Sequence, residues 1–262
     1  MRENKEISER PAANKKVRAL IIAVLVIILV CSGVFLALHF AGVLSAESDE
    51  KRLTTAPHSE SDSQLAENPV DFESLQAGNS EIYAWITVPG TEVDHPVCQS
   101  RSDDEYYLRH RASDRQWSSA GAIFTQSMNA LDFNDPVTVI YGHNGYSESM
   151  FTSLHQFEDE TFFNEHEYFY IYTPDRKLTY HILSAFRYDD RHIMNSFNFS
   201  NPSELAAFQQ TLADPQSMLV NVRGGITLDS DSKVVVLSTC FDNDDNSRYL
   251  VSGVLISDEK TE

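Results

Sequence analysis

Cys240, Arg248 and His143 are the residues of this chain whose type and position suit nucleophilic chemistry. Cys240 ends the apolar run 234–240, and Arg248 follows it by eight residues. A continuous β-branched run predicts a buried strand with the thiol at its end. A nearby cation favours the thiolate, which is the nucleophilic form, and could equally bind a substrate backbone or a developing oxyanion. The alternatives are a buried inert cysteine and a solvated arginine that neutralises nearby aspartates.

His143 is the candidate for the base that such a thiol needs. It follows a second buried-strand pattern, 137–141, and only Gly142 lies between them. Glycine permits close backbone approach, and a strand end holds a side chain on a rigid frame. The chain has nine histidines. The other eight fall in expected loops, helix faces, strand edges, a polar stalk or an apolar N-terminal segment, where local structural roles are expected.

Short strand patterns separated by turns dominate the second part of the chain. A helix is predicted over 202–212, with Asn201 as its cap and Pro202 in its first turn. A shorter helix is expected to begin after Pro69 and to end near Gly78. Short runs of this kind favour a β-barrel or sandwich over a parallel βαβ sheet. The predicted strands are 83–88, 93–97, 122–125, 137–141, 168–172, 178–186, 234–238 and 250–256.

The N-terminal part has the pattern of a membrane anchor. Residues 1–18 are basic, 19–44 carry no charged residue, and 45–67 are polar and acidic, without apolar periodicity. About 20 apolar residues span a bilayer, and the preceding basic residues predict a cytoplasmic N-terminus. We therefore expect a basic cytoplasmic segment, a single transmembrane helix, a flexible stalk and an extracellular domain over 68–262. The alternative is a signal peptide cleaved after Ala46.

Composition limits the partners and cofactors. The formal net charge of −19 without a basic stripe in the folded region argues against nucleic acid as a partner. Of the three cysteines, only Cys98 and Cys240 could pair outside the apolar segment, and a free Cys240 is the simpler interpretation. The acidic run 242–245 lacks the Gly and terminal Glu of a calcium loop, so we expect no metal and no cofactor.

The motifs around these residues resemble those of sortases, most closely the class B sortases. The two central motifs are Leu237-Ser238-Thr239-Cys240 with a downstream Arg, and Tyr141-Gly142-His143-Asn144. The resemblance covers about 68–257, including the helix before the cysteine strand. Supporting stretches occur in order at 83–91, 94–97, 106–110, 121–124 and 149–151.

This resemblance implies a fold, an activity and a site. The fold would be mainly β, a closed eight-stranded sortase-type barrel with a few peripheral helices. His143, Cys240 and Arg248 match the family's catalytic residues. In the family the cysteine attacks a threonine carbonyl in a C-terminal sorting motif. A thioester acyl-enzyme forms, and an amine of a cell-wall precursor (lipid II) or of a pilin lysine resolves it, with the histidine as general acid and then base.

Residues beside the catalytic positions are expected to contact the substrate: Ser238, Thr239, Asn144 and Asp242. Thr239 either shapes the oxyanion site or packs within its strand. The eight-residue separation of Cys240 and Arg248 is shorter than expected for class B, which bears on substrate preference. Two other functions remain open: a cysteine peptidase that hydrolyses without transfer, and a non-catalytic surface adhesin on the same scaffold.

Overall fold

The computed structural model describes residues 65–145, 150–241 and 244–261, and of residues 240, 241, 244 and 245 it describes only the backbone. The predicted basic segment 1–18, the predicted membrane helix 19–44 and nearly all of the predicted stalk 45–67 lie outside these residues. Across the described ranges, no helix has both the length and the apolar character needed to cross a membrane.

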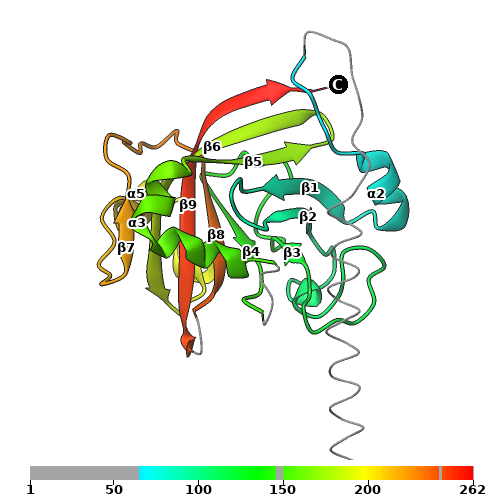
Figure 1. Ribbon diagram of the computed structural model, residues 1–262, viewed down its shortest axis with the longest axis horizontal. Helices are drawn as coiled ribbons and strands as arrows, with labels where there is room; N and C mark the ends of the chain where they lie inside the picture. The colour runs from blue at the N-terminus through cyan, green and yellow to red at the C-terminus, as the bar shows by residue number, and fades with distance from the viewer. Residues whose placement is uncertain (1–64, 146–149, 242–243, 262) are drawn as a thin grey trace, which may run out of the picture. The chain divides into compact units, whose positions relative to one another are not determined.

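In this described part, nine strands form one sheet that closes on itself (Figure 1). The strand order is β5-β1-β2-β3-β4-β8-β9-β6-β7, and β5 also pairs with β6, so eight strands form a ring and β7 extends from β6. The strands are β1 Ile82–Thr87, β2 Asp94–Cys98, β3 Ile123–Phe124, β4 Val137–Tyr141, β5 Tyr168–Thr173, β6 Arg176–Asp189, β7 Val220–Val222, β8 Val234–Phe241 and β9 Asp244–Lys260.

The predicted mainly β fold with an eight-stranded barrel is confirmed, and each predicted run overlaps one strand of the ring. The helices are short and peripheral. They are α2 Phe72–Gly78, η1 Tyr106–Leu108, η2 Thr152–Glu158, α3 Glu160–Glu165, α4 Ile193–Ser196 and α5 Pro202–Ala213. Helix α5 matches its prediction: the Asn201 side chain caps it by accepting from Ser203 N, and Pro202 lies in its first turn.

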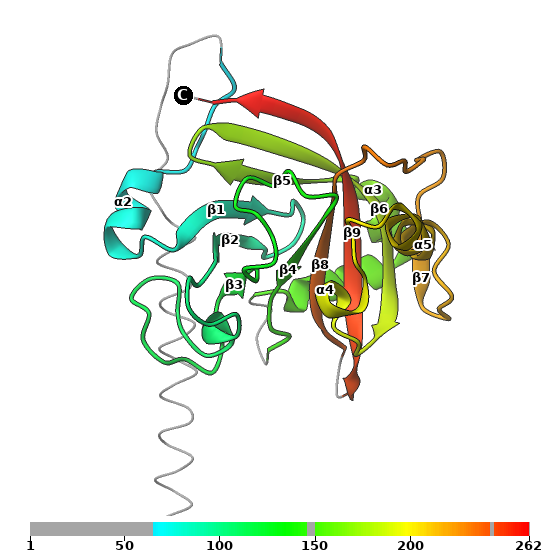
Figure 2. The same ribbon diagram turned by 180° about the vertical axis from the view of Figure 1, so that it is seen from behind.

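Strands β4 and β8 are parallel neighbours, paired from Val137 with Val234 to Tyr141 with Ser238. Both are buried on both faces. In β8, Val235 and Leu237 face the barrel interior, whereas Val234 and Val236 pack beneath α4 and α5 on the outer face (Figure 2). A strand that is covered on both sides does not alternate apolar with exposed polar residues, which explains why these two runs are mostly apolar.

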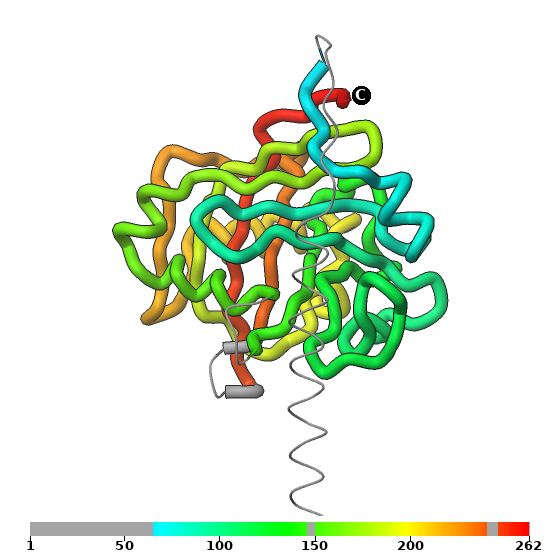
Figure 3. Tube along the Cα trace, turned by 45° about the vertical axis from the view of Figure 1, so that its right-hand side comes forward, coloured from blue at the N-terminus to red at the C-terminus, as the bar shows by residue number. Residues whose placement is uncertain are grey.

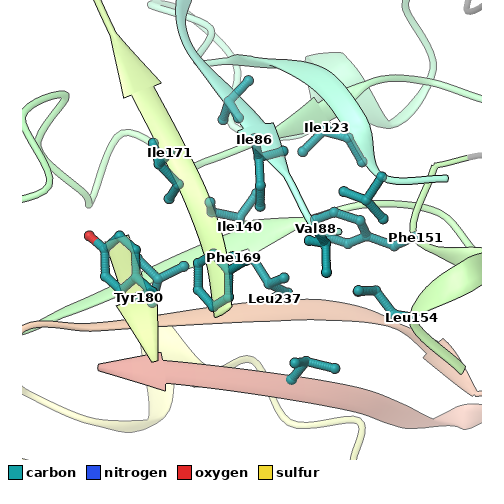
Figure 4. Packing of buried hydrophobic residues seen from close by; sticks show 14 of the residues in the cluster. Ile86, Val88, Ile123, Ile140, Phe151, Leu154, Phe169, Ile171, Tyr180 and Leu237 are labelled. Carbon is teal, nitrogen blue, oxygen red and sulfur yellow. The ribbon is translucent and has the colours of Figure 1, made fainter. Parts of the chain in front are cut away.

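The barrel interior is filled by side chains from most of the ring (Figure 4). Ile140 of β4 and Leu237 of β8 meet Phe169 and Tyr180 there, and all four are fully buried. The Phe169 and Tyr180 rings stack with centroids 5.0 Å apart. This close-packed interior fixes the strands, and through them the positions of their ends.

Strand β9 is longer than predicted. It begins at Asp244 rather than at residue 250, and its polar first part pairs with both β8 and the end of β6. Main-chain hydrogen bonds to two neighbours hold this part in the sheet without an apolar pattern. The extension matters because it includes Arg248.

Candidate active site

The ends of β4, β8 and β9 bring the three predicted catalytic residues to neighbouring positions. The last pair of the β4–β8 ladder is Tyr141 with Ser238, and Gly142 N donates to Ser238 O over 3.1 Å. His143 and Cys240 each follow this last pair by two residues, so both lie at the same end of the two neighbouring strands. These strand ends lie on one side of the barrel (Figure 3).

The β8–β9 register pairs Cys240 directly with Arg248. Directly paired residues of antiparallel strands have Cβ atoms about 4.5–5.5 Å apart. The short separation in sequence is therefore that of a hairpin, in which the Cys and the Arg lie on adjacent strands. Arg248 is half-buried, and its guanidinium donates from Nη1 to Ser247 O over 3.0 Å.

His143 is held by one ring nitrogen and by its main chain. Its Nε2 lies 2.7 Å from Leu108 O, and its carbonyl accepts from Phe151 N over 3.1 Å. A carbonyl oxygen only accepts, so Nε2 must carry a hydrogen and donate it. The remaining ring nitrogen, Nδ1, is therefore the one that can exchange a proton with a substrate.

Gly142 is a close-packing position, as its sequence context predicts. A Cβ atom there would lie 2.5 Å from Ile123 Cδ1 and 2.7 Å from the Phe151 ring. Phe151 N also donates to His143 O. The absence of a side chain at Gly142 therefore lets Phe151 pack closely against the end of β4, next to His143.

A cavity of about 230 Å³ lies at this site. Of the predicted residues, His143, Arg248, Ser238 and Thr239 line it together. Residues that the sequence analysis did not select complete the wall: Glu105, Leu108, Phe124, Gln126, Tyr141, Gly142, Asp190, Arg191, His192 and Ile193.

Three polar atoms in this wall are buried and have no hydrogen-bond partner among the described residues: Thr239 Oγ1, Tyr141 OH and Gln126 Oε1. Burial raises the pKa of Tyr141, and the Arg248 charge opposes that rise, so Tyr141 is a neutral hydroxyl that can donate. A buried polar group without a partner is costly, and a polar ligand would supply the missing bonds.

Of the two other predicted substrate contacts, one is described by the structure and does not line this cavity. Asn144 is not among the cavity-lining residues, and its Nδ2 lies 3.3 Å from His155 Nε2. Asp242 falls outside the described residues. Within those residues, no group of three or more His, Cys, Asp and Glu side chains is arranged to hold a metal ion.

Several of the lining residues that sequence reasoning did not select lie in connecting segments. His192 caps α4 by accepting from Asn195 N at Nδ1, over 3.2 Å, and its ring also lines the cavity. Its neighbour Arg191 pairs with Asp189 and lies over the Tyr188 ring. No periodicity marks such positions. By contrast, Leu108, Phe124, Tyr141 and Gly142 fall in the stretches that carry the family resemblance, so the sequence did hold a signal at these four positions.

The sortase domain model matches residues 86–256 of this chain. The chain therefore belongs to the sortase family, whose members work as cysteine transpeptidases on substrates with sorting signals. Its relatives are class B enzymes. Sortase B of Listeria monocytogenes is 26% identical over 189 residues, which cover 71% of this chain and 74% of that protein.

Solved structures of class B sortases share this fold. The chain matches Clostridium perfringens sortase B with a TM-score of 0.62 and 29% identity, over 71% of this chain and 100% of that one. It also matches a Streptococcus pyogenes class B sortase involved in pilus biogenesis, with a TM-score of 0.60 and 30% identity, over 71% of this chain and 98% of that one.

Proposed function

We propose that this chain is a membrane-anchored cysteine transpeptidase. It cleaves a C-terminal sorting motif through a thioester acyl-enzyme and transfers the protein to an amine of the cell wall or of a pilin. The observation that carries the proposal is the strand register. It pairs Cys240 of β8 with Arg248 of β9, and β8 also pairs with β4, whose end leads into His143. His143 and Arg248 line the same cavity.

In the first half-reaction the Cys240 thiolate attacks the carbonyl carbon of the scissile peptide bond. A C–S bond forms and the carbonyl becomes an oxyanion. The Arg248 guanidinium, with five N–H donors and a permanent charge, stabilises that oxyanion. His143 Nδ1–H protonates the leaving nitrogen, the C–N bond breaks, and a thioester remains.

The second half-reaction reverses these proton movements. An incoming amine attacks the thioester carbonyl, and His143 Nδ1 accepts the proton that the amine loses. The C–S bond breaks, a new amide is released, and the Cys240 thiolate is regenerated. The hydrogen bond from Nε2 to Leu108 O holds the ring so that Nδ1 faces the substrate in both half-reactions.

The cavity wall suits a polar peptide. Thr239 Oγ1, Tyr141 OH and Gln126 Oε1 have no protein partner among the described residues, so peptide amide, carbonyl and side-chain groups can bond to them. We assign Thr239 to substrate contact on this basis, and Ser238 because it lines the same cavity. For Asp242 the assignment rests only on its position in the sequence, two residues after Cys240.

The proposed location follows from the sequence of the N-terminal part. Residues 19–44 would anchor the protein in the lipid bilayer as a single-pass helix, with residues 1–18 in the cytoplasm. The stalk over 45–67 would carry the catalytic domain outside the cell membrane, where sorting-signal proteins and acceptor amines meet it.

The test uses the full chain, purified in detergent, with a library of peptides that carry candidate sorting motifs. We expect cleavage, a mass-detectable thioester on Cys240, and ligation when triglycine is added as the amine. Cys240→Ala should abolish all three. Cleavage without ligation would indicate a hydrolytic peptidase, and retained turnover in Cys240→Ala would refute the mechanism. Absence of any reaction would favour an adhesin.

A further inference from the structure

We propose that His155, held by Glu158, is a positioning residue that sets the spacing between His143 and Arg248. The proposal rests on the catalytic roles proposed above for these two residues. His155 lies on η2, outside the cavity wall, and its side chain is mostly buried. It contacts the residue that directly follows His143 and the residue that directly follows Arg248.

The first contact is on the His143 side. His155 Nε2 lies 3.3 Å from Asn144 Nδ2, and Asn144 directly follows His143 in the chain. The same segment is tied to the start of η2, because Asn144 forms a β-bridge with Met150 and His143 O accepts from Phe151 N. The turn after β4 is therefore attached to η2 by both main chain and side chain.

The second contact is on the Arg248 side. The His155 ring stacks on Tyr249, with centroids 4.8 Å apart and an interplanar angle of 23°. Tyr249 is fully buried and directly follows Arg248 in β9. It pairs with Thr239 in the β8–β9 register. One imidazole ring thus touches both the segment after His143 and the strand that carries Arg248.

Glu158 selects the form of the ring that makes both contacts. Its Oε1 lies 2.5 Å from His155 Nδ1, and both residues are on η2. A carboxylate only accepts, so Nδ1 carries a hydrogen. In the neutral ring Nε2 is then an acceptor, which matches the N–H of the Asn144 amide. Burial and, second to it, the charge of Glu158 raise the pKa of Tyr249, so the tyrosine under the His155 ring is a neutral hydroxyl.

The arrangement affects the chemistry through geometry. Arg248 and His143 act on opposite ends of the same breaking bond, so their separation must match the substrate. A displacement of about 1 Å can lower a rate by about 100-fold. A partial loosening at His155 should therefore lower kcat by about tenfold and leave KM nearly unchanged.

His155→Phe is the first variant, because a phenyl ring can keep the stack on Tyr249 and loses both hydrogen bonds. Glu158→Gln keeps an acceptor for Nδ1–H, whereas Glu158→Leu removes it. The matched control is His166→Phe. The His166 ring also stacks on an aromatic, Phe162, and its Nδ1 contacts Phe162 O over 2.9 Å, away from the cavity.

Two readouts are measured on the full chain in detergent: kcat and KM for a cleaved peptide, and the rate of Cys240 alkylation by iodoacetamide at neutral pH, located by mass spectrometry. A thiolate reacts and a thiol does not, so looser placement of Arg248 should slow alkylation. We expect His155→Phe and Glu158→Leu to lower both rates about tenfold, and Glu158→Gln and His166→Phe to stay within about twofold of the parent.

The inference is overturned if His155→Phe keeps both rates within about twofold of the parent, or if His166→Phe loses as much. If His155→Phe does not fold, as judged by circular dichroism, the two Glu158 variants decide the question by the same criteria. If the parent cleaves no peptide, the proposed function fails. The alkylation comparison still decides the positioning role, because it needs no substrate.

Discussion

Gly142→Ala is the substitution whose effect the structure defines most closely. The added methyl would lie 2.5 Å from Ile123 Cδ1 and 2.7 Å from the Phe151 ring. Carbon atoms in contact normally lie about 3.5–4.0 Å apart, so the neighbours must retreat by about 1 Å. Overpacking of this kind costs about 1–3 kcal/mol. In a domain of this size, each kcal/mol lowers Tm by about 2–4 °C.

The effect of Gly142→Ala on catalysis should exceed its effect on stability. Phe151 N donates to His143 O, so a shift of Phe151 also moves the imidazole for which we propose a catalytic role. A displacement of about 1 Å corresponds to a loss of about 100-fold in kcat/KM. Peptide cleavage, measured well below Tm, gives this value directly. In the double variant with Ile123→Val, which removes the closest methyl, part of the activity should return.

Gly224→Ala is the control for this prediction. A Cβ atom at residue 224 would have no heavy atom within 4 Å, so the same change in backbone freedom occurs without a clash. We expect this variant to keep parental activity and to be as stable as the parent or slightly more stable. If Gly142→Ala kept kcat/KM within about threefold of the parent, close packing at that position would not position His143, and the reasoning would be refuted.

Four further outcomes are expected. Arg248→Lys should lower kcat by about 100-fold, because an ammonium cannot reproduce the guanidinium fork at the oxyanion; steady-state kinetics that show parental kcat would contradict this. Tyr141→Phe should raise the KM for peptide without lowering Tm, since the removed hydroxyl has no protein partner among the described residues; an unchanged KM would exclude a bond to substrate. Asn201→Ala should cost about 1 kcal/mol in chemical unfolding and leave kcat unaltered, because it removes the α5 cap and an exposed hydrogen bond to Glu204, both at the first turn of α5. Burial lowers the pKa of His95 to about 4. The unfolded chain takes up that proton near pH 6.5, so stability should fall by about 3 kcal/mol as the pH drops from about 6.5 to 4, and urea titrations of His95→Gln should lose this slope.

The sequence predicted the central strands because their burial leaves a simple signal. The runs at β4 and β8 are almost wholly apolar, since one face lines the barrel and the other lies under α4 and α5. The end of each apolar run therefore indicates the end of the strand to within a few residues, although β8 continues through Ser238 and Thr239 to Phe241. The positions of His143 and Cys240 at strand ends were therefore readable from residue types alone.

Polar strand ends were not readable in this way. The first part of β9 is held by ladders to β8 and β6, and its side chains show no alternation. The short β7 is an edge strand whose two valines, Val220 and Val222, face outward. In both cases pairing with a distant strand forms the structure, and a single sequence does not encode that pairing as a pattern.

The cavity wall shows the same limit. His143, Ser238, Thr239 and Arg248 were found because motifs surround them. Gln126 and the segment at His192 lie between elements, and they reach the cavity only through the closure of the barrel. Asn144 shows that a residue next to a predicted catalytic position need not point its side chain into the cavity. Its amide contacts His155, and the residue does not line the cavity.

The closure of the ring has a consequence for how the protein acquires its activity. The β4–β8 ladder joins segments that are distant in sequence, from Val137 with Val234 to Tyr141 with Ser238, and β1 must also find β5. Contacts of such long range form slowly. A proteolytic fragment that lacks either half cannot hold His143 beside Cys240. Recovery of turnover after dilution from denaturant should therefore report the formation of the β4–β8 ladder.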